Sequence, residues 1–407
     1  MYLWVLQQIL VKITQKSINK MINKNKDKLQ QKALEACETE GNILLTMATG
    51  TGKSRIAIEY AKKHNVQSIA LLVPTENLRD SNWQEEFYKW DAASLWDNNV
   101  TRLCYASGSK IKGNEFDLVI MDESHNITEL SYEFFEDNIC KKVIALTATS
   151  PKKLGKVGIF SKLNFRRIFS VDLDEAIKLG VVSPYRITVV YTQLNNTLKY
   201  IDAGSKAKPF KTTEKNQYDF LTKMIHSIQL AEEINGEPVE KYYTPKERSM
   251  LEMYIRKRMH LINSLLSKEH AARVILKTIP EEERYLIFAG SIQQAESLCE
   301  YRYHSKTDNT HLEMFQKGEL NRLSCVEALN EGINIPDVDG SVMVQIRSSD
   351  IKLIQRIGRN IRFREGHEAH IYILVCKDTQ DEVWFSKASE SLDESRIEYK
   401  SINEFLV

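Results

Sequence analysis

The stretch MATGTGKS, residues 47–54, constrains this chain more than any other part of its sequence. It follows the apolar run NILLT (42–46) and leads into SRIAIEYAKKH (54–64), which has the apolar spacing of a helix. A glycine-rich turn between a strand and a helix directs backbone N–H groups and the positive end of the helix dipole at one point. The sequence therefore predicts a phosphate-binding loop, although Met47 stands where the pattern GxxxxGK[ST] has its first glycine.

Each part of this loop has an expected task. Backbone N–H groups would surround the β- and γ-phosphates of a nucleotide, Lys53 would add positive charge, and the Ser54 hydroxyl would ligate Mg²⁺. The predicted nucleotide-binding residues are Thr49, Gly50, Thr51, Gly52, Lys53 and Ser54.

Two series of apolar runs alternate with helical patterns along the chain. Such alternation is typical of parallel sheets covered by helices, so we expect an α/β protein with two sheets. The first series comprises NILLT (42–46), SIALLVP (68–74), FDLVIMD (116–122) and KVIALTAT (142–149), and the second comprises RYLIFAG (284–290), LSCVEAL (323–329), GSVMVQI (340–346) and AHIYILV (369–375).

The pattern between these series suggests domain boundaries. We expect an N-terminal basic extension (1–27), a first domain (28–168), a linker (169–186) and a second domain (187–407) with a helical insertion at about 195–280. The segment TSPKKLGKVGIF (149–160) has the composition of a loop.

Two acidic residues follow one of the candidate strands. In FDLVIMDESH, Asp122 and Glu123 come at the carboxyl end of the strand, the edge where parallel sheets bind ligands. Asp122 is placed to hold Mg²⁺ through water, together with Ser54. Alternation along an extended chain would direct Glu123 the other way, as general base toward the attacking water.

A basic helix is the third element. In IQRIGRNIR (354–362), Gln355, Arg359 and Arg362 share one face. Arginines so placed suit a γ-phosphate reached from a second domain, where an arginine finger raises a rate by roughly 10³ to 10⁵. We expect Arg359 and Arg362 to be catalytic and to meet the triphosphate near Lys53, with Gln355 and Arg356 also at the nucleotide; a solvated basic helix is the alternative.

Composition leaves the partner open. The formal charge of +1 is no polyanion-binding signature, yet a protein that grips nucleic acid in one groove need not be basic overall. The six cysteines are scattered without a CxxC pair, which argues against structural zinc and favours reduced thiols inside a cell. Because no run reaches the ~20 apolar residues of a membrane span, we expect an intracellular protein without a membrane segment.

Several of these stretches resemble a known family when taken in order. TMATGTGKS, DESH, TATS (147–150), NEGINIP (330–336) and QRIGRNIR are similar to motifs I, II, III, V and VI of superfamily 2 helicases. The closest branch is the DEAH-like one, which includes DNA-repair helicases and restriction-enzyme motor subunits. VPTENLRDSNWQEEF (73–87) resembles motif Ia and LIFAGSIQQAESL (286–298) resembles motif IV. The resemblance implies two RecA-like parallel-sheet domains in tandem. It also implies that residues of these motifs bind ATP and Mg²⁺.

The resemblance also implies roles that the residues alone do not. Gln30, or its neighbour Gln31, would read adenine. Many relatives have aspartate in place of Asn334, a departure that bears on a local coupling contact. The other implied assignments are His125, Thr147 and Thr149 for coupling nucleotide state to domain closure, Gly332 and Asn334 for motif V at the nucleotide, and Pro74, Thr75 and Ser291 for nucleic-acid contact.

The expected function is an ATP-dependent DNA helicase or translocase in repair or recombination, acting on single-stranded or branched DNA. Such contacts are mostly to phosphate and sugar, and weaken with salt. The alternatives are an RNA helicase, the motor subunit of a restriction system, a nucleic-acid clamp that binds ATP without turnover, and a nucleotide-binding protein of unrelated purpose.

Two basic features remain open at this stage. Lysines recur at every fourth position from Lys12 to Lys32, and on a helix they would form either a solvated stripe or an arm that contacts phosphate. The insertion carries Arg256, Lys257 and Arg258 on a predicted helix with Tyr254 and Leu261 on its apolar side. This helix packs on the second domain or contacts duplex or branched DNA.

Overall fold

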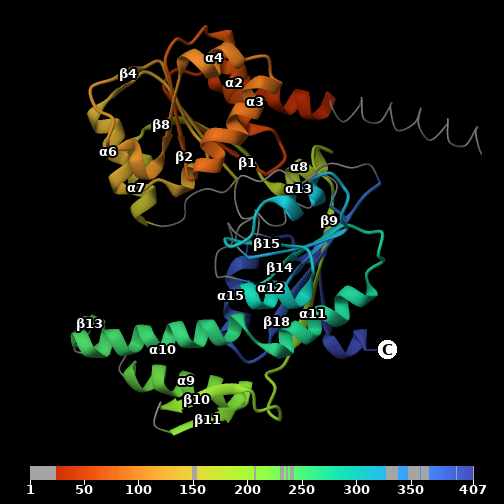
Figure 1. The fold of residues 1–407 in the computed structure, drawn as a ribbon. Coiled ribbons are helices and arrows are strands. Elements are labelled where there is room, and N and C mark those ends of the chain that lie inside the picture. The colour runs from red at the N-terminus through yellow and green to blue at the C-terminus, as the bar shows by residue number, and fades with distance from the viewer. Residues whose placement is uncertain are drawn as a thin grey trace, which may run out of the picture. The chain divides into compact units, whose positions relative to one another are not determined.

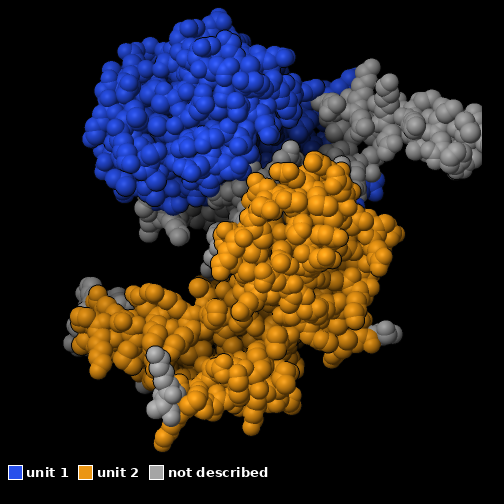
Figure 2. Space-filling view, in the orientation of Figure 1, with its two compact units in different colours: residues 1–185, 329–339, 351–369 blue, residues 186–328, 340–350, 370–407 orange. Residues whose placement is uncertain are grey.

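The computed structural model describes residues 24–148, 154–205, 208–229, 233–234, 237–238, 243–326, 338–346, 358, 366–390 and 392–406. The chain divides into two compact units (Figure 2). Unit 1 comprises residues 1–185, 329–339 and 351–369, and unit 2 comprises residues 186–328, 340–350 and 370–407.

A six-stranded sheet forms the centre of unit 1. Its strand order is β3-β2-β5-β7-β1-β8, and each neighbouring pair runs parallel. The predicted apolar runs supply four of these strands, and every residue of β2 and β7 is buried. The strands are β1 (Asn42–Met47), β2 (Ile69–Val73), β3 (Val100–Cys104), β5 (Leu118–Met121), β7 (Val143–Thr147) and β8 (Phe165–Val171), with a separate parallel pair of β4 (Glu115–Phe116) and β6 (Ile139–Cys140).

Helices connect the strands of unit 1 and cover its sheet (Figure 1). On one face, Phe134 of α6 and Phe160 of α7 pack against Leu72, Val119 and Ala145 of the sheet. The helices are residues 24–37, α2 (Lys53–Lys63), α3 (Trp83–Lys89), α4 (Ala93–Asn99), α5 (Tyr105–Gly108), α6 (Glu129–Asp137), α7 (Leu154–Lys162) and α8 (Leu173–Lys178), with the π-helical turn η1 (Leu78–Asn82) and the 3₁₀ turn η2 (Ser124–Asn126).

One local expectation is wrong in this region, because the segment expected to be a loop after residue 149 contains most of α7. The expected linker 169–186 includes the end of β8, the short helix α8 and the start of β9. Asp172 caps α8, since its side chain accepts a hydrogen bond from the Glu175 backbone N–H. The boundary between the units falls between Tyr185 and Arg186, within strand β9.

Unit 2 contains a seven-stranded sheet of order β15-β16-β14-β17-β18-β9-β19. Helix α11 covers one face, where Ala272 and Ile275 pack on Ile287, Val342 and other core residues. The sheet and its helices are β9 (Tyr185–Thr192), α11 (Leu266–Thr278), β14 (Tyr285–Phe288), α12 (Ile292–Leu298), β15 (Arg302–Tyr303), α13 (Thr310–Gln316), β16 (Arg322–Cys325), β17 (Gly340–Met343), β18 (Ala369–Cys376), α15 (Gln380–Ser389), η4 (Glu394–Arg396), β19 (Ile397–Ser401) and η5 (Ile402–Phe405).

The insertion in unit 2 is only partly helical. It holds an antiparallel hairpin of β10 (Ile201–Ser205) and β11 (Lys208–Thr212), the short pair β12 (Glu233–Ile234) and β13 (Glu237–Pro238), and the helices α9 (Glu214–Ile228) and α10 (Pro245–Asn263). Helices α9 and α10 lie side by side (Figure 1). Helix α10 has a capping box, because Thr244 and Glu247 exchange hydrogen bonds at its first turn.

The basic cluster of α10 does not act as a unit. Arg256 pairs with Glu252 at 2.6 Å on its own helix, whereas Arg258 donates to Thr222 and Gln380 and lies over the Tyr218 ring. These contacts favour the packing interpretation for Arg258. Among the helices that the structure describes, none is long and apolar enough to span a membrane.

Candidate active site

The phosphate loop connects β1 to α2 in unit 1. Gly50 and Gly52 have φ values of 85° and 86°, a left-handed conformation that glycine adopts without strain. Between them, Thr51 is fully buried, and its hydroxyl donates to the Ala48 carbonyl at 2.7 Å. The loop therefore makes the tight turn between strand and helix that its sequence predicts.

Lys53 lies within the electrostatic influence of the acidic residues of the DESH segment. Its ammonium group donates to the Met47 carbonyl at 2.9 Å. Burial lowers the pKa of Lys53, while the negative charges of Glu123 and Asp122 act in the opposite direction. The structure thus brings the loop lysine and both predicted carboxylates into one electrostatic environment at the carboxyl edge of the sheet.

Asp122 is held from two sides. One carboxylate oxygen accepts a hydrogen bond of 2.9 Å from Trp83 Nε1, and the other accepts from the Glu123 backbone N–H at 2.9 Å. The Tyr105 hydroxyl donates to the Asp122 carbonyl at 2.9 Å. Burial raises the pKa of Asp122, and the Trp83 bond and the Lys53 charge counter it.

The orientation of Glu123 comes from its own left-handed backbone conformation and not from strand alternation. Strand β5 ends at Met121, and Glu123 has φ 45° and ψ 50°, unusual for a non-glycine residue. The expectation that alternation directs Glu123 is therefore wrong in its reason. Such a conformation costs on the order of 1–3 kcal/mol and is concentrated at functional sites.

His125 connects the DESH segment to the end of β7. Its Nδ1 lies 3.1 Å from the Thr147 hydroxyl and 3.5 Å from a Glu123 carboxylate oxygen. Burial lowers the pKa of His125 to about 4, so the ring is neutral at pH 7. Lys156 of α7 donates to the His125 carbonyl. These contacts join two residues for which sequence resemblance implies a coupling role.

The structure gives Gln30 and Gln31 different environments. The Gln30 side chain is buried, its amide donates to the Thr51 carbonyl at 2.9 Å, and its oxygen accepts from Arg55 at 2.7 Å. Gln31 points outward and donates to Glu35 on its own helix. Only Gln30 therefore touches the phosphate loop.

Two contacts of this site escaped the sequence analysis. Ser54 donates to Glu86 of α3 at 3.1 Å, and Trp83 of the same helix donates to Asp122. SNWQEEFYKW shows that Trp83, Glu86 and Trp90, at i, i+3 and i+7, share a helical face, but it does not show which residues that face contacts.

The segment of the predicted arginines is described at one residue. Gly358 lies so close to Thr49 that a Cβ atom on Gly358 would overlap the Thr49 side chain, and both residues belong to unit 1. The Thr49 hydroxyl is buried and has no hydrogen-bond partner within the part of the chain that the structure describes. Thr149, Gly332, Asn334, Gln355, Arg356, Arg359 and Arg362 lie outside the described residues.

The predicted nucleic-acid residues lie elsewhere. Pro74 and Thr75 directly follow β2 in unit 1, and the Thr75 hydroxyl accepts from the Leu78 backbone N–H at the start of η1. Ser291 is the N-cap of α12 in unit 2, where it accepts from Gln294 N–H. Both hydroxyls therefore stabilise local turns in the structure.

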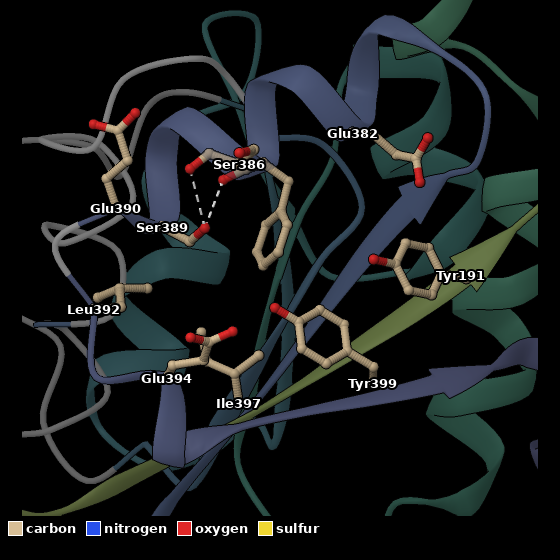
Figure 3. A pocket seen from close by; sticks show the side chains of 10 residues that line it. Tyr191, Glu382, Ser386, Ser389, Glu390, Leu392, Glu394, Ile397 and Tyr399 are labelled. Atoms are coloured by element: carbon tan, nitrogen blue, oxygen red, sulfur yellow. Dashed lines mark hydrogen bonds between the residues drawn. The ribbon is translucent and has the colours of Figure 1, made fainter.

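Unit 2 has a separate pocket of 480 Å³ between α15 and β19 (Figure 3). Its floor includes Tyr191 and Tyr399, whose rings stack at 6.0 Å with an interplanar angle of 13°. None of the predicted site residues lines this pocket.

Comparisons with known proteins place these features in a family. Residues 7–152 match the family described as "Type III restriction enzyme, res subunit", and residues 257–364 match the family described as "Helicase conserved C-terminal domain". The chain belongs to helicase superfamily 2. The predicted family and its enzyme class, a helicase that hydrolyses ATP, are thereby confirmed.

Two relatives of this superfamily 2 helicase differ in sequence identity and in how much of each chain is matched. The DNA 3'-5' translocase XPB2 of Sulfurisphaera tokodaii is 22% identical over 86% of this chain and 82% of the relative. The ATP-dependent DNA helicase fml1 of Schizosaccharomyces pombe is 30% identical, over 39% of this chain and 17% of the relative.

Solved structures show the same fold. The helicase domain of Pyrococcus furiosus Hef matches with a TM-score of 0.53 at 16% identity, over 89% of this chain and 97% of that chain. The Type ISP restriction-modification enzyme LlaBIII bound to DNA matches with a TM-score of 0.51 at 16% identity, over 91% of this chain and 31% of that chain. The predicted pair of RecA-like α/β domains is confirmed.

Proposed function

We propose that this helicase couples ATP hydrolysis to movement along, or unwinding of, DNA in repair or recombination. The observation that carries the proposal is that the phosphate loop follows β1 while Asp122 and Glu123 follow β5 at the same edge of the sheet, near enough for their charges to act on Lys53. The phosphate loop, the proposed metal ligand Asp122 and the proposed general base Glu123 then lie at one edge of a parallel sheet. The DNA substrate is inferred from the DNA translocase and DNA helicase among the relatives.

The loop is suited to a nucleoside triphosphate. A Cβ atom on Gly52 would collide with the Gln30 amide, so glycine at this position lets the Gln30 side chain approach the loop backbone. Within the described residues, the Lys53 ammonium group donates to the Met47 and Ala48 carbonyls, and phosphate oxygens are stronger partners for an ammonium group. Gln30 reaches the loop from the preceding helix, where it would contact the base.

Mg²⁺ fits the same place. Among the described residues, no three His, Cys, Asp or Glu side chains are grouped to hold a metal by themselves. Ser54 and Asp122 would therefore share the ion with phosphate oxygens and water, as Mg²⁺ prefers. The ion would neutralise charge on the phosphates. Glu123 would accept a proton from the attacking water, and the His125–Thr147 contact would transmit the change to the rest of unit 1.

Arg359 and Arg362 remain part of this proposal. Their support is indirect, through the contact of Gly358 with Thr49, which places one residue of the arginine segment at the phosphate loop. Arginine at a γ-phosphate raises the rate of hydrolysis by roughly 10³ to 10⁵. The Arg359→Ala and Arg362→Ala variants should therefore keep nucleotide affinity and lose turnover.

Phosphate release tests the proposal directly. It should be measured with single-stranded, duplex, forked and four-way DNA, and with matched RNA. We expect stimulation by DNA in the wild type and loss of release in Lys53→Ala and Glu123→Gln. The exposed Lys63, which pairs with Glu38, provides the matched control: Lys63→Ala should behave as the wild type.

The outcomes separate the alternatives. Stronger stimulation by RNA would identify an RNA helicase. Background release with every nucleic acid, despite ATP binding, would identify a clamp. Stimulation by DNA without strand separation on a fork would identify a translocase, as expected for a restriction-type motor.

A further inference from the structure

Helix α3 presents one face to the phosphate loop and to the DESH segment together. Trp83 and Glu86 are three residues apart and so lie on that face. Trp83 Nε1 donates to Asp122 at 2.9 Å, and Glu86 accepts from the Ser54 hydroxyl at 3.1 Å. One helix thus contacts each of the two side chains that the proposed function assigns to Mg²⁺.

The Glu86 carboxylate is itself fixed in place. Its Oε2 atom, which receives the Ser54 hydroxyl, also accepts from Trp90 Nε1 at 3.0 Å, and its Oε1 atom accepts from Lys89 at 3.1 Å. Trp90 is held in turn by Arg55, whose guanidinium lies 4.1 Å from the ring centroid. A carboxylate bound this way has little freedom to turn away from Ser54.

The direction of the Ser54 bond matters for metal binding. The hydroxyl proton points to Glu86, so the lone pairs of the oxygen are turned away from that carboxylate. A hydroxyl ligates a cation through its lone pairs, and an acceptor for its proton makes the oxygen a better ligand. The Trp83 bond does the complementary task for Asp122, since it occupies one carboxylate oxygen and fixes the plane of the group.

We propose that Glu86 and Trp83 are positioning residues for the metal site, holding Ser54 and Asp122 in the orientation that binds Mg²⁺ with nucleotide. This inference rests on the proposed function, because it takes Ser54 and Asp122 as the metal ligands. Neither Glu86 nor Trp83 is proposed to take part in the chemical step.

The test is the Mg²⁺ dependence of nucleotide binding, measured without nucleic acid. A fluorescent ATP analogue is titrated at a series of Mg²⁺ concentrations and in EDTA, with the full chain. Loss of a residue that supports a metal ligand weakens metal affinity about 10- to 100-fold. Glu86→Ala should raise the Mg²⁺ concentration for half-maximal binding about tenfold and leave the affinity in EDTA unchanged.

Two further variants separate positioning from general damage. Glu86→Gln keeps an oxygen that can accept the Ser54 proton, so it should shift the Mg²⁺ requirement less than Glu86→Ala. Trp83→Phe keeps the ring but loses the N–H group, and it should shift the requirement as Glu86→Ala does. Glu85, adjacent on α3 and exposed, is the matched control, and Glu85→Ala should match the wild type.

Four results would overturn the inference. The Mg²⁺ requirement of Glu86→Ala could equal that of the wild type, could be shared by Glu85→Ala, or could fall, which would mean that Glu86 competes with the metal for Ser54. Equal loss of binding in EDTA and in Mg²⁺ would also reject it. Because this assay reads binding and not turnover, absent DNA-stimulated hydrolysis would refute the proposed function while leaving the Glu86 result interpretable.

Discussion

The ammonium group of Lys53 donates a hydrogen bond of 2.9 Å to the backbone carbonyl of Met47. Met47 is the residue that departs from the glycine of the phosphate-loop pattern, and it is the last residue of β1. It is not among the residues with positive φ, so its conformation is open to any L-residue. The contact that this position makes with Lys53 uses a carbonyl, which every residue has.

Restoring glycine at this position should therefore weaken the protein. The Met47 side chain is fully buried, and removing a buried methionine side chain costs about 2–5 kcal/mol. We expect Met47→Gly to lower the free energy of unfolding by that order in urea titrations without raising nucleotide affinity. Met253 on α10 is 39% exposed, and Met253→Ala should be nearly neutral. A gain in nucleotide affinity in Met47→Gly would contradict this reasoning.

The glycine at the end of the loop should behave in the opposite way. Gly52→Ala places a Cβ atom against the Gln30 amide and forces alanine into φ 86°. We expect it to abolish ATP binding measured by calorimetry. Gly113 has φ 73° with nothing near its Cβ position, so Gly113→Ala pays a similar backbone cost, about 1–2 kcal/mol, and should still bind ATP. Equal loss in both variants would mean that backbone strain alone explains the effect.

The preference for adenine over guanine can be tested at two neighbouring residues, Gln30 and Gln31. Gln30 contacts Thr51 and Arg55 beside the loop, whereas Gln31 donates to Glu35 on its own helix. Gln30→Ala should reduce the preference for ATP over GTP about fivefold, the value of one hydrogen bond of ~1 kcal/mol. Gln31→Ala should leave the preference unchanged. Competition between labelled ATP and unlabelled GTP measures both, and an effect of Gln31→Ala would reject the assignment.

Acid should destabilise the protein through its buried histidines. Burial lowers the pKa of His125 and of His370 from 6.5 to about 4. The unfolded chain takes up these protons near pH 6.5 and the folded chain does not, so the stabilisation is complete above pH 6.5 and is lost as pH falls toward 4. Each group contributes a slope of about 1.4 kcal/mol per pH unit.

Thermal unfolding between pH 7 and pH 4.5 measures this effect. His370 lies in unit 2 and pairs with the Thr188 hydroxyl at 2.8 Å. His370→Gln should unfold with a weaker dependence on pH than the wild type, whereas His260→Gln, at an exposed position on α10, should keep the dependence. Identical pH profiles in all three proteins would show that other groups dominate acid unfolding.

The sequence predicts those features that depend on neighbouring residues. Apolar runs such as IALLV gave β2, and the motif spacing located Lys53, Asp122 and Glu123. Helix α7 was missed because Pro151, Gly155 and three lysines resemble a loop, although Phe160 packs into the core of unit 1. Strand β8 was missed because Arg166 and Arg167 interrupt its apolar residues.

Contacts between distant segments were beyond the sequence. Nothing in the spacing of Ser54 and Glu86 shows that α2 and α3 lie together, because that arrangement depends on the order of strands in the sheet. Similarly, periodicity in residues 24–37 could not choose between Gln30 and Gln31. The choice depends on which side of the helix faces the Thr51 carbonyl.

The parallel pairing of β9 with β19 has a consequence for synthesis on the ribosome. All strands of the unit 1 sheet have been translated once Val171 is made, so that sheet can form on the growing chain. In unit 2, residues 187–191 must wait for residues 397–401 before their ladder is complete. The other neighbour of β9, strand β18 (Ala369–Cys376), is also made late, so both edges of β9 lack their partners for nearly half of translation, and chaperones that capture extended apolar segments are expected to engage there.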